Sequence, residues 1–127
     1  MSDNSTIKTA TLNGTVAQYR FVEGTMAAAT ATDAIADVAL GISQMSGVSG
    51  DKIGICVDGK TYLQVDGSGT AIAAGDAIMA EASGAGQGVK AAGATAVKQA
   101  TALEAATTDG AIIEVIFEGG PKEVVGS

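Results

Sequence analysis

Three times along the chain, a glycine and an aspartate stand side by side immediately before a mainly apolar run. The stretches are SGDKIGICV, AAGDAIMAE and TTDGAIIEVIF, with the pairs at residues 50–51, 75–76 and 109–110. Glycine adopts positive φ without steric cost, and an aspartate side chain can hydrogen-bond the backbone two residues on. Each pair therefore predicts the start of a β-strand, and three such units favour an all-β fold over an α/β fold.

Size and composition point to one small β domain. A chain of 127 residues can build one modest apolar core, and its 18 glycines favour short elements joined by tight turns. Two Tyr, two Phe and no Trp leave the apolar volume per side chain low. We expect a compact β-barrel or β-sandwich over residues 15–120, preceded by a flexible N-terminal arm at residues 1–14 and followed by a short tail at residues 121–127.

Further strands are expected from local alternation. Residues 16–22, VAQYRFV, alternate in the β period and direct Tyr19 and Phe21 towards the core. A strand or irregular crossing is expected at residues 25–31, with a turn at Asp33 and a strand at residues 38–42. The Gly/Ala-rich stretch EASGAGQGVKAAGATA is a predicted hairpin or surface loop before a strand at residues 97–103.

The sequence ICVDGKTYLQV predicts a hairpin, because an Asp-Gly pair at residues 58–59 stands between two apolar runs. In that hairpin Val57 would face Lys60, and Ile55 would face Tyr62. Both faces of such a strand pair would be apolar, so both must be covered. One side would meet the core, and the other would meet a second sheet or another subunit.

Residues 101–117, TALEAATTDGAIIEVIF, begin with helix formers and end with strand formers. The alternation typical of a β-strand also fits the first half of this segment, and the Asp-Gly pair can form the turn between two strands. We therefore predict a final hairpin and no helix at residues 103–106. Ile113, Val115 and Phe117 would face the core, while Ile112 and Ile116 would lie on the opposite face with Glu114.

The charge balance indicates which partners the chain has. The 14 acidic residues outnumber the 7 basic ones, giving a net charge of −7, and Arg20 is the single arginine. Nucleic acid is a poor partner for such a surface. No secretory signal and no apolar stretch near the ~18 residues that span a bilayer are seen, so we expect synthesis in a cytoplasm and no membrane partner.

The residues that could support catalysis or metal binding are better explained by structure. Histidine is absent, which removes the common triads and imidazole metal sites, and Cys56 lacks a base and lies between apolar neighbours. The glycine string at residues 84–88 lacks the features of a phosphate loop, and residues 66–70 offer one carboxylate where a calcium loop needs several. Asp51 and Asp58 could form an acid pair, but turn chemistry already explains them. We expect no enzyme activity, cofactor, metal or small-molecule substrate.

One alternative comes from the lysines beside the predicted turns. Biotin and lipoyl carrier domains present their modified lysine at a tight turn between strands, as Lys52 or Lys60 could. The flanking residues do not match the hairpins of those families, and an exposed lysine at a turn is the simpler interpretation.

Five motifs in the same order resemble the small capsid cement proteins of tailed phages, the DUF2190-like head-decoration group. The resemblance covers about residues 16–117 and is carried by VAQYRFV, ALGISQ, GDKIGICVDG, GTAIAAGDAIMAEASGAG and ATALEAATTDGAIIEVIF. It implies a virion structural protein with a mainly β fold. Such a protein binds the outside of the assembled head and reinforces contacts between major capsid protein subunits, commonly as a homotrimer.

If the chain has this function, its polar N-terminal arm is the segment expected to contact the capsid or a neighbouring subunit. Ile7 and Leu12 are isolated apolar residues in residues 1–14 and are the candidate contacts with the capsid or a neighbouring subunit. If the arm is loose, deletion of residues 2–12 should weaken capsid binding and leave the fold intact.

Overall fold

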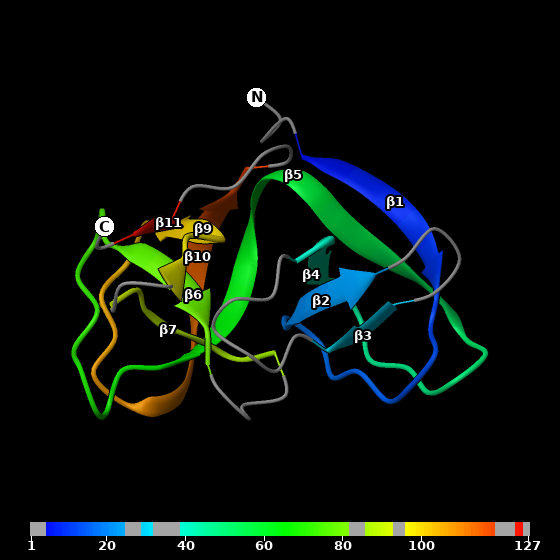
Figure 1. Cartoon of the computed structure of the whole chain (residues 1–127), viewed down its shortest axis with the longest axis horizontal. Helices are drawn as coiled ribbons and strands as arrows, with labels where there is room; N and C mark the ends of the chain where they lie inside the picture. The colour runs from blue at the N-terminus through cyan, green and yellow to red at the C-terminus, as the bar shows by residue number, and fades with distance from the viewer. Residues whose placement is uncertain are drawn as a thin grey trace.

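The computed structural model describes residues 5–24, 29–31, 39–81, 86–92, 96–118 and 124–125, and in these residues all regular structure is β. Figure 1 shows two halves joined by one long arched strand, β5. The elements in chain order are β1 (Thr6–Thr11), β2 (Phe21–Gly24), β3 (Ala29–Ala31), β4 (Gly41–Ser43), β5 (Lys52–Asp66), β6 (Ala77–Ala80), β7 (Gly88–Lys90), β8 (Ala96–Val97), β9 (Ala100–Ala102), β10 (Asp109–Phe117) and β11 (Val124–Val125).

The predicted hairpin at residues 58–59 is wrong, because β5 runs through this position as one strand of 15 residues. A two-residue hairpin turn of type I′ needs positive φ at both central residues. Gly59 has a φ of 110°, but Asp58 is not among the described residues with positive φ. The strand bends there and changes partner: residues 52–58 pair with β1, and residues 59–66 pair with β10. The expected pairs Val57–Lys60 and Ile55–Tyr62 therefore do not form.

The second half of β5 closes a five-stranded barrel. Around the ring, β5 pairs with β10, β10 with β9, β9 with β6, β6 with β7, and β7 with β5 again. The contact between β5 and β7 is parallel and joins Val65 to Gly88, whereas the other pairings in the ring are antiparallel. The structure thus confirms the all-β class and selects the barrel from the two predicted architectures.

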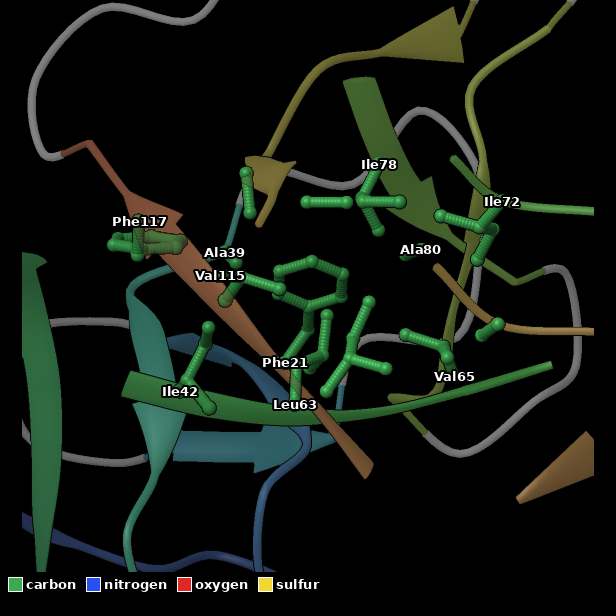
Figure 2. Close-up of a cluster of buried hydrophobic side chains, with 14 residues drawn as sticks. Phe21, Ala39, Ile42, Leu63, Val65, Ile72, Ile78, Ala80, Val115 and Phe117 are labelled. Atoms are coloured by element: carbon green, nitrogen blue, oxygen red, sulfur yellow. The ribbon is translucent and has the colours of Figure 1, made fainter. Parts of the chain in front are cut away.

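The barrel is filled by aliphatic side chains around two phenylalanines whose rings lie tilted against each other. The rings of Phe21 and Phe117 have centroids 6.4 Å apart. Figure 2 shows Phe21 in the middle of the cluster, above the β5 side chains Leu63 and Val65. Because Phe21 comes from β2, which pairs with β3 and β4 in the other half, its ring ties the two halves together.

A smaller apolar cluster stabilises the half that contains β1 to β4. Its buried members are Leu12, Val16, Val22, Ile53 and Ile55. The loose arm expected over residues 1–14 is therefore wrong for residues 6–12. Residues 6–11 form β1, whose three threonines and one isoleucine suit a strand, and Leu12 is 2% exposed. Residues 1–4 lie outside the described residues.

The three predicted strand starts are confirmed: β5 begins at Lys52, β6 at Ala77 and β10 at Asp109. The first two share one geometry, because Gly50 and Gly75 have φ values of 95° and 94°. In each turn the aspartate accepts a hydrogen bond from the N–H three residues before it, at 2.9 Å from Val48 and 2.8 Å from Ala73. The aspartates thus bond backwards along the chain, not two residues on as expected.

The final hairpin is confirmed as an antiparallel β9–β10 pair with Val115 opposite Ala102. The connection spans residues 103–108 and forms no helix, since Leu103 donates to the Glu114 carbonyl and Ala106 pairs with Ile72. Backbone pairing with neighbouring strands overrides the helix propensity of this segment. The three residues predicted to face the core are at most 3% exposed: Ile113, Val115 and Phe117.

The remaining strand predictions are met in part. Residues 16–20 are not a strand, and β2 begins only at Phe21, which is buried as predicted. β4 overlaps the strand expected at residues 38–42, and β9 overlaps the one at 97–103. Within the Gly/Ala-rich stretch at residues 81–96, β7 forms and pairs with β6, which comes just before that stretch. The crossing at residues 25–31 is described only at β3, and the turn at Asp33 lies outside the described residues. In the predicted tail, β11 pairs with β8.

Candidate interaction surface

Exposed apolar side chains gather on the outer side of the β5–β10 pair. On β10 the outward residues Ile112 and Ile116 are 54% and 38% exposed, and on β5 Tyr62 is 46% exposed. Tyr62 lies opposite Glu114 in the ladder, so both isoleucines are its diagonal neighbours at about 7–8 Å between Cα atoms. We call this set, together with Tyr19, the β5–β10 face.

Tyr19 reaches this face through a strained backbone. Its φ of 61° lies in the left-handed region, which costs a bulky residue about 1–3 kcal/mol unless its surroundings hold it. Ser43 holds the turn: its carbonyl accepts from Tyr19 N–H at 2.8 Å, and its Oγ accepts from Arg20 N–H at 3.0 Å. The Tyr19 carbonyl accepts from Gln64 N–H at 2.8 Å. As a result the Tyr19 ring stacks beside Tyr62, with centroids 5.8 Å apart.

Charged and amide groups surround the apolar residues. Lys60 Nζ lies 3.5 Å from Glu114 Oε2, and Arg20 donates from Nε and Nη2 to Gln64 Oε1 at 3.2 and 3.0 Å. The carboxylate of Glu104 accepts from Glu114 N–H at 2.7 Å. An apolar, tyrosine-rich centre with a polar rim is the usual anatomy of a protein–protein contact.

Sequence reasoning missed this surface because it directed Tyr19 towards the core and placed Tyr62 in a hairpin that does not form. Tyr19 is half-buried beside the Tyr62 ring, so its inward assignment is wrong, and Tyr62 is exposed on the continuous strand β5. The useful signal was in β10, whose run AIIEVIF is apolar on both faces. The inner face fills the barrel, and the outer face is the part that the fold leaves uncovered.

The two predicted contact residues lie in different environments. Ile7 in β1 is 50% exposed and stays available for a contact. Leu12 packs inside the smaller cluster, and its N–H donates to the Asp51 carbonyl at 2.8 Å. A contact through the Leu12 side chain would have to open that cluster, so the structure removes Leu12 from the candidates.

The lysines of the carrier alternative are not at a hairpin tip. Lys60 lies inside β5 beside Glu114, because the hairpin that would present it does not form. Lys52 is exposed and is the first residue of β5, directly after the turn at Gly50. Both lysines are paired within β5, Lys52 with Thr11 of β1 and Lys60 with Ile116 of β10, whereas a biotin or lipoyl carrier presents its lysine at the turn itself.

The candidates for chemistry have structural roles. Cys56 is fully buried as predicted, and burial raises the pKa of its thiol, which keeps it protonated. Asp51 and Asp58 lie about 23 Å apart along β5, too far for an acid pair. A Cβ on Gly88 would lie 2.7 Å from Ile78 and 2.8 Å from Leu63, so this glycine serves close packing. No group of metal-ligating side chains occurs within the described residues.

The comparison with solved structures finds a likeness in fold to a phage protein. The base of a head fibre, described as "head fiber gp8.5 N base in bacteriophage phi29", is 15% identical to this chain, with a TM-score of 0.68. The likeness covers 90% of this chain and 94% of that one. It shows a shared fold. No protein-family model matches the chain, and no curated protein matches its sequence. Among the described residues, no helix is long and apolar enough to cross a membrane.

Three carboxylates lie near one another at one end of the barrel. Asp66, the last residue of β5, pairs across the ladder with Asp109, the first residue of β10. Ser68 donates to Asp66 from Oγ at 2.6 Å and from N–H at 2.9 Å, and these bonds lower the pKa of Asp66. Burial raises the pKa of Glu81, and a hydrogen bond to Asp66 and repulsion from Asp66 and Asp109 raise it further.

The variant Glu81→Gln is expected to stabilise the protein slightly at pH 7. The pKa of Glu81 is higher in the folded protein than in the unfolded chain. The stability that Glu81 contributes is therefore complete below its ordinary pKa of 4.5 and is lost as the pH rises through its folded-state pKa. A neutral amide avoids that loss, so we expect a gain of at most about 0.5 kcal/mol at this partly exposed position.

The matched variant Asp66→Asn should have the opposite sign. The pKa of Asp66 is lowered, so its contribution is present above 3.8 and is lost as the pH falls through the folded value. Thermal unfolding of both variants between about pH 3 and pH 8 measures the two effects. A shift in the same direction for both at pH 7 would contradict the assignment.

Proposed function

We propose that this chain is a structural protein of a phage head, and more specifically a decoration or cement protein. It binds the outer surface of the assembled head and stabilises contacts between major capsid protein subunits. The observation that carries the proposal is the likeness in fold to the base of a phage head fibre, which extends over nearly all of both chains. The five ordered motifs that resemble the DUF2190-like cement proteins support the same class.

The proposed mechanism is binding energy and involves no catalysis. A protein that binds the expanded shell, and not its broken form, stabilises the shell by mass action. The protein would be made in the host cytoplasm and would assemble as a homotrimer on the outside of the virion. A net charge of −7 keeps it from competing for packaged DNA, whose phosphates are also negative. The proposal includes no nucleic acid, membrane, cofactor or small-molecule partner.

The test compares shells of the major capsid protein with and without this chain. Electron microscopy should show added density on the outer surface of the shell, and decorated shells should break at a higher temperature than bare ones. The control is an unrelated acidic β protein of similar size at the same concentration, which should add no density. Shells that stay bare at saturating protein concentration would contradict the proposal.

A further inference from the structure

The β5–β10 face differs from the rest of the surface in its charge. At its centre Lys60 pairs with Glu114, and Arg20 and Glu104 lie nearby, so these four charges cancel, whereas the carboxylates of Asp66 and Asp109 lie at one end of the same strand pair. The whole chain carries a net charge of −7, and subtracting this balanced set leaves −7 on the remaining residues. Two copies of the chain therefore repel each other less when this neutral centre meets its counterpart than when acidic parts of their surfaces meet.

The charges on this face are also self-complementary. Each copy offers a lysine and a glutamate beside the same apolar residues, so one patch supplies both partners of an intersubunit pair. The rest of the surface is acidic, so it suits a basic partner and not a second copy of this acidic chain. The composition of the face thus favours another copy of this chain as its occupant.

The face is prepared for contact before a partner arrives. β5 and β10 hold Tyr62, Ile112 and Ile116 on a paired ladder, and the hydrogen bonds from Ser43 and Gln64 hold Tyr19 in its strained conformation. Backbone strain of this kind persists only where surrounding contacts impose it, and it clusters at functional positions. Ordered tyrosines with few rotatable bonds lose little entropy when they are buried, which favours association.

We infer that the β5–β10 face is the contact through which copies of this chain associate with one another. Tyr62, Ile112 and Ile116 form its centre, and Lys60 and Glu114 form part of its rim. This leaves the acidic surface elsewhere for other partners. The inference deepens the proposed function, because it names the surface through which copies of the proposed decoration protein contact one another, and it rests on that function for its biological role.

The test is sedimentation of the full-length protein without capsids, at about 100 µM and after serial dilution. The wild type should be an oligomer. The double variant with Ile112→Ser and Ile116→Ser should dissociate, with a dissociation constant raised at least about thirtyfold, as expected for central contact residues. The matched control replaces Met45 and Val48, which are 50% and 55% exposed outside the face, with serine, and should change the constant by less than about threefold. Circular dichroism checks that both variants fold.

Tyrosine labelling reports the location of the contact. The chain has two tyrosines, Tyr19 and Tyr62, and both lie on the face. Nitration should therefore be slower in the associated wild type than in the diluted protein or in the double variant. A monomeric wild type, an associated double variant, or equal nitration in both states would overturn the inference. If the protein is an oligomer but leaves shells bare, this inference stands and the proposed function is wrong. If the protein is a monomer that decorates shells, the proposed function stands and this inference is wrong.

Discussion

Replacing Phe21 with alanine is expected to lower the free energy of unfolding by about 3–5 kcal/mol, the usual cost of removing a buried phenylalanine ring. Phe21 is 0% exposed and packs against Phe117 in the barrel. The neighbouring backbone is held in place, because Phe21 N–H donates to the Gly86 carbonyl at 2.7 Å and Gly88 is paired with both Val65 and Ala80. The cavity should therefore remain largely open.

Chemical denaturation followed by far-UV circular dichroism measures this loss. Phe21→Leu keeps most of the apolar volume and should cost less than about half as much. Tyr62→Ala, at a 46% exposed position, is the surface control and should change stability by no more than about 0.5 kcal/mol in the dissociated protein. A loss below about 1 kcal/mol for Phe21→Ala would mean that its ring does not join the two halves.

Local turn chemistry predicted where strands begin but not which strands pair. The Gly-Asp and Asp-Gly pairs before β5, β6 and β10 were found because glycine at positive φ and an aspartate hydrogen bond act within a few residues. At residues 58–59 the same rule failed. The longest pairings of β5 are with β1 and β10, which lie far away in the chain, and β4 and β7 pair with it as well, so the edges that a local hairpin would use are occupied. Sequence spacing carries no information about those distant partners.

The candidate site was predictable only in part. The alternation of β10 correctly separated Ile113, Val115 and Phe117 from Ile112 and Ile116. The position of Tyr19 could not be predicted, because no glycine marks its left-handed turn and the conformation depends on Ser43 and Gln64 far along the chain. The start of the chain looked like a loose arm because its residues are polar. An edge strand also exposes polar side chains, so composition cannot distinguish the two.

Deleting residues 2–12 is expected to lower the free energy of unfolding by at least about 3 kcal/mol, and the sequence-based expectation that the fold would survive is replaced by this one. The deletion removes β1, which pairs with residues 52–58 of β5. It also removes the Leu12 side chain and exposes Val16, Val22 and Ile53 of the smaller cluster. Gly50 N–H, which donates to the Leu12 carbonyl at 2.9 Å, would lose its partner at the start of β5.

Two controls separate folding from binding. Deletion of residues 2–4 removes none of the described contacts and should leave the unfolding midpoint unchanged. If deletion of residues 2–12 also left the midpoint unchanged, the role of β1 in stability would be contradicted. Ile7→Ser replaces the long deletion as the test of a capsid contact. Ile7 is 50% exposed, so its loss should cost no more than about 0.5 kcal/mol of stability. Lower occupancy on shells at unchanged stability would then identify Ile7 as a contact, and unchanged occupancy would assign β1 a role in the fold alone.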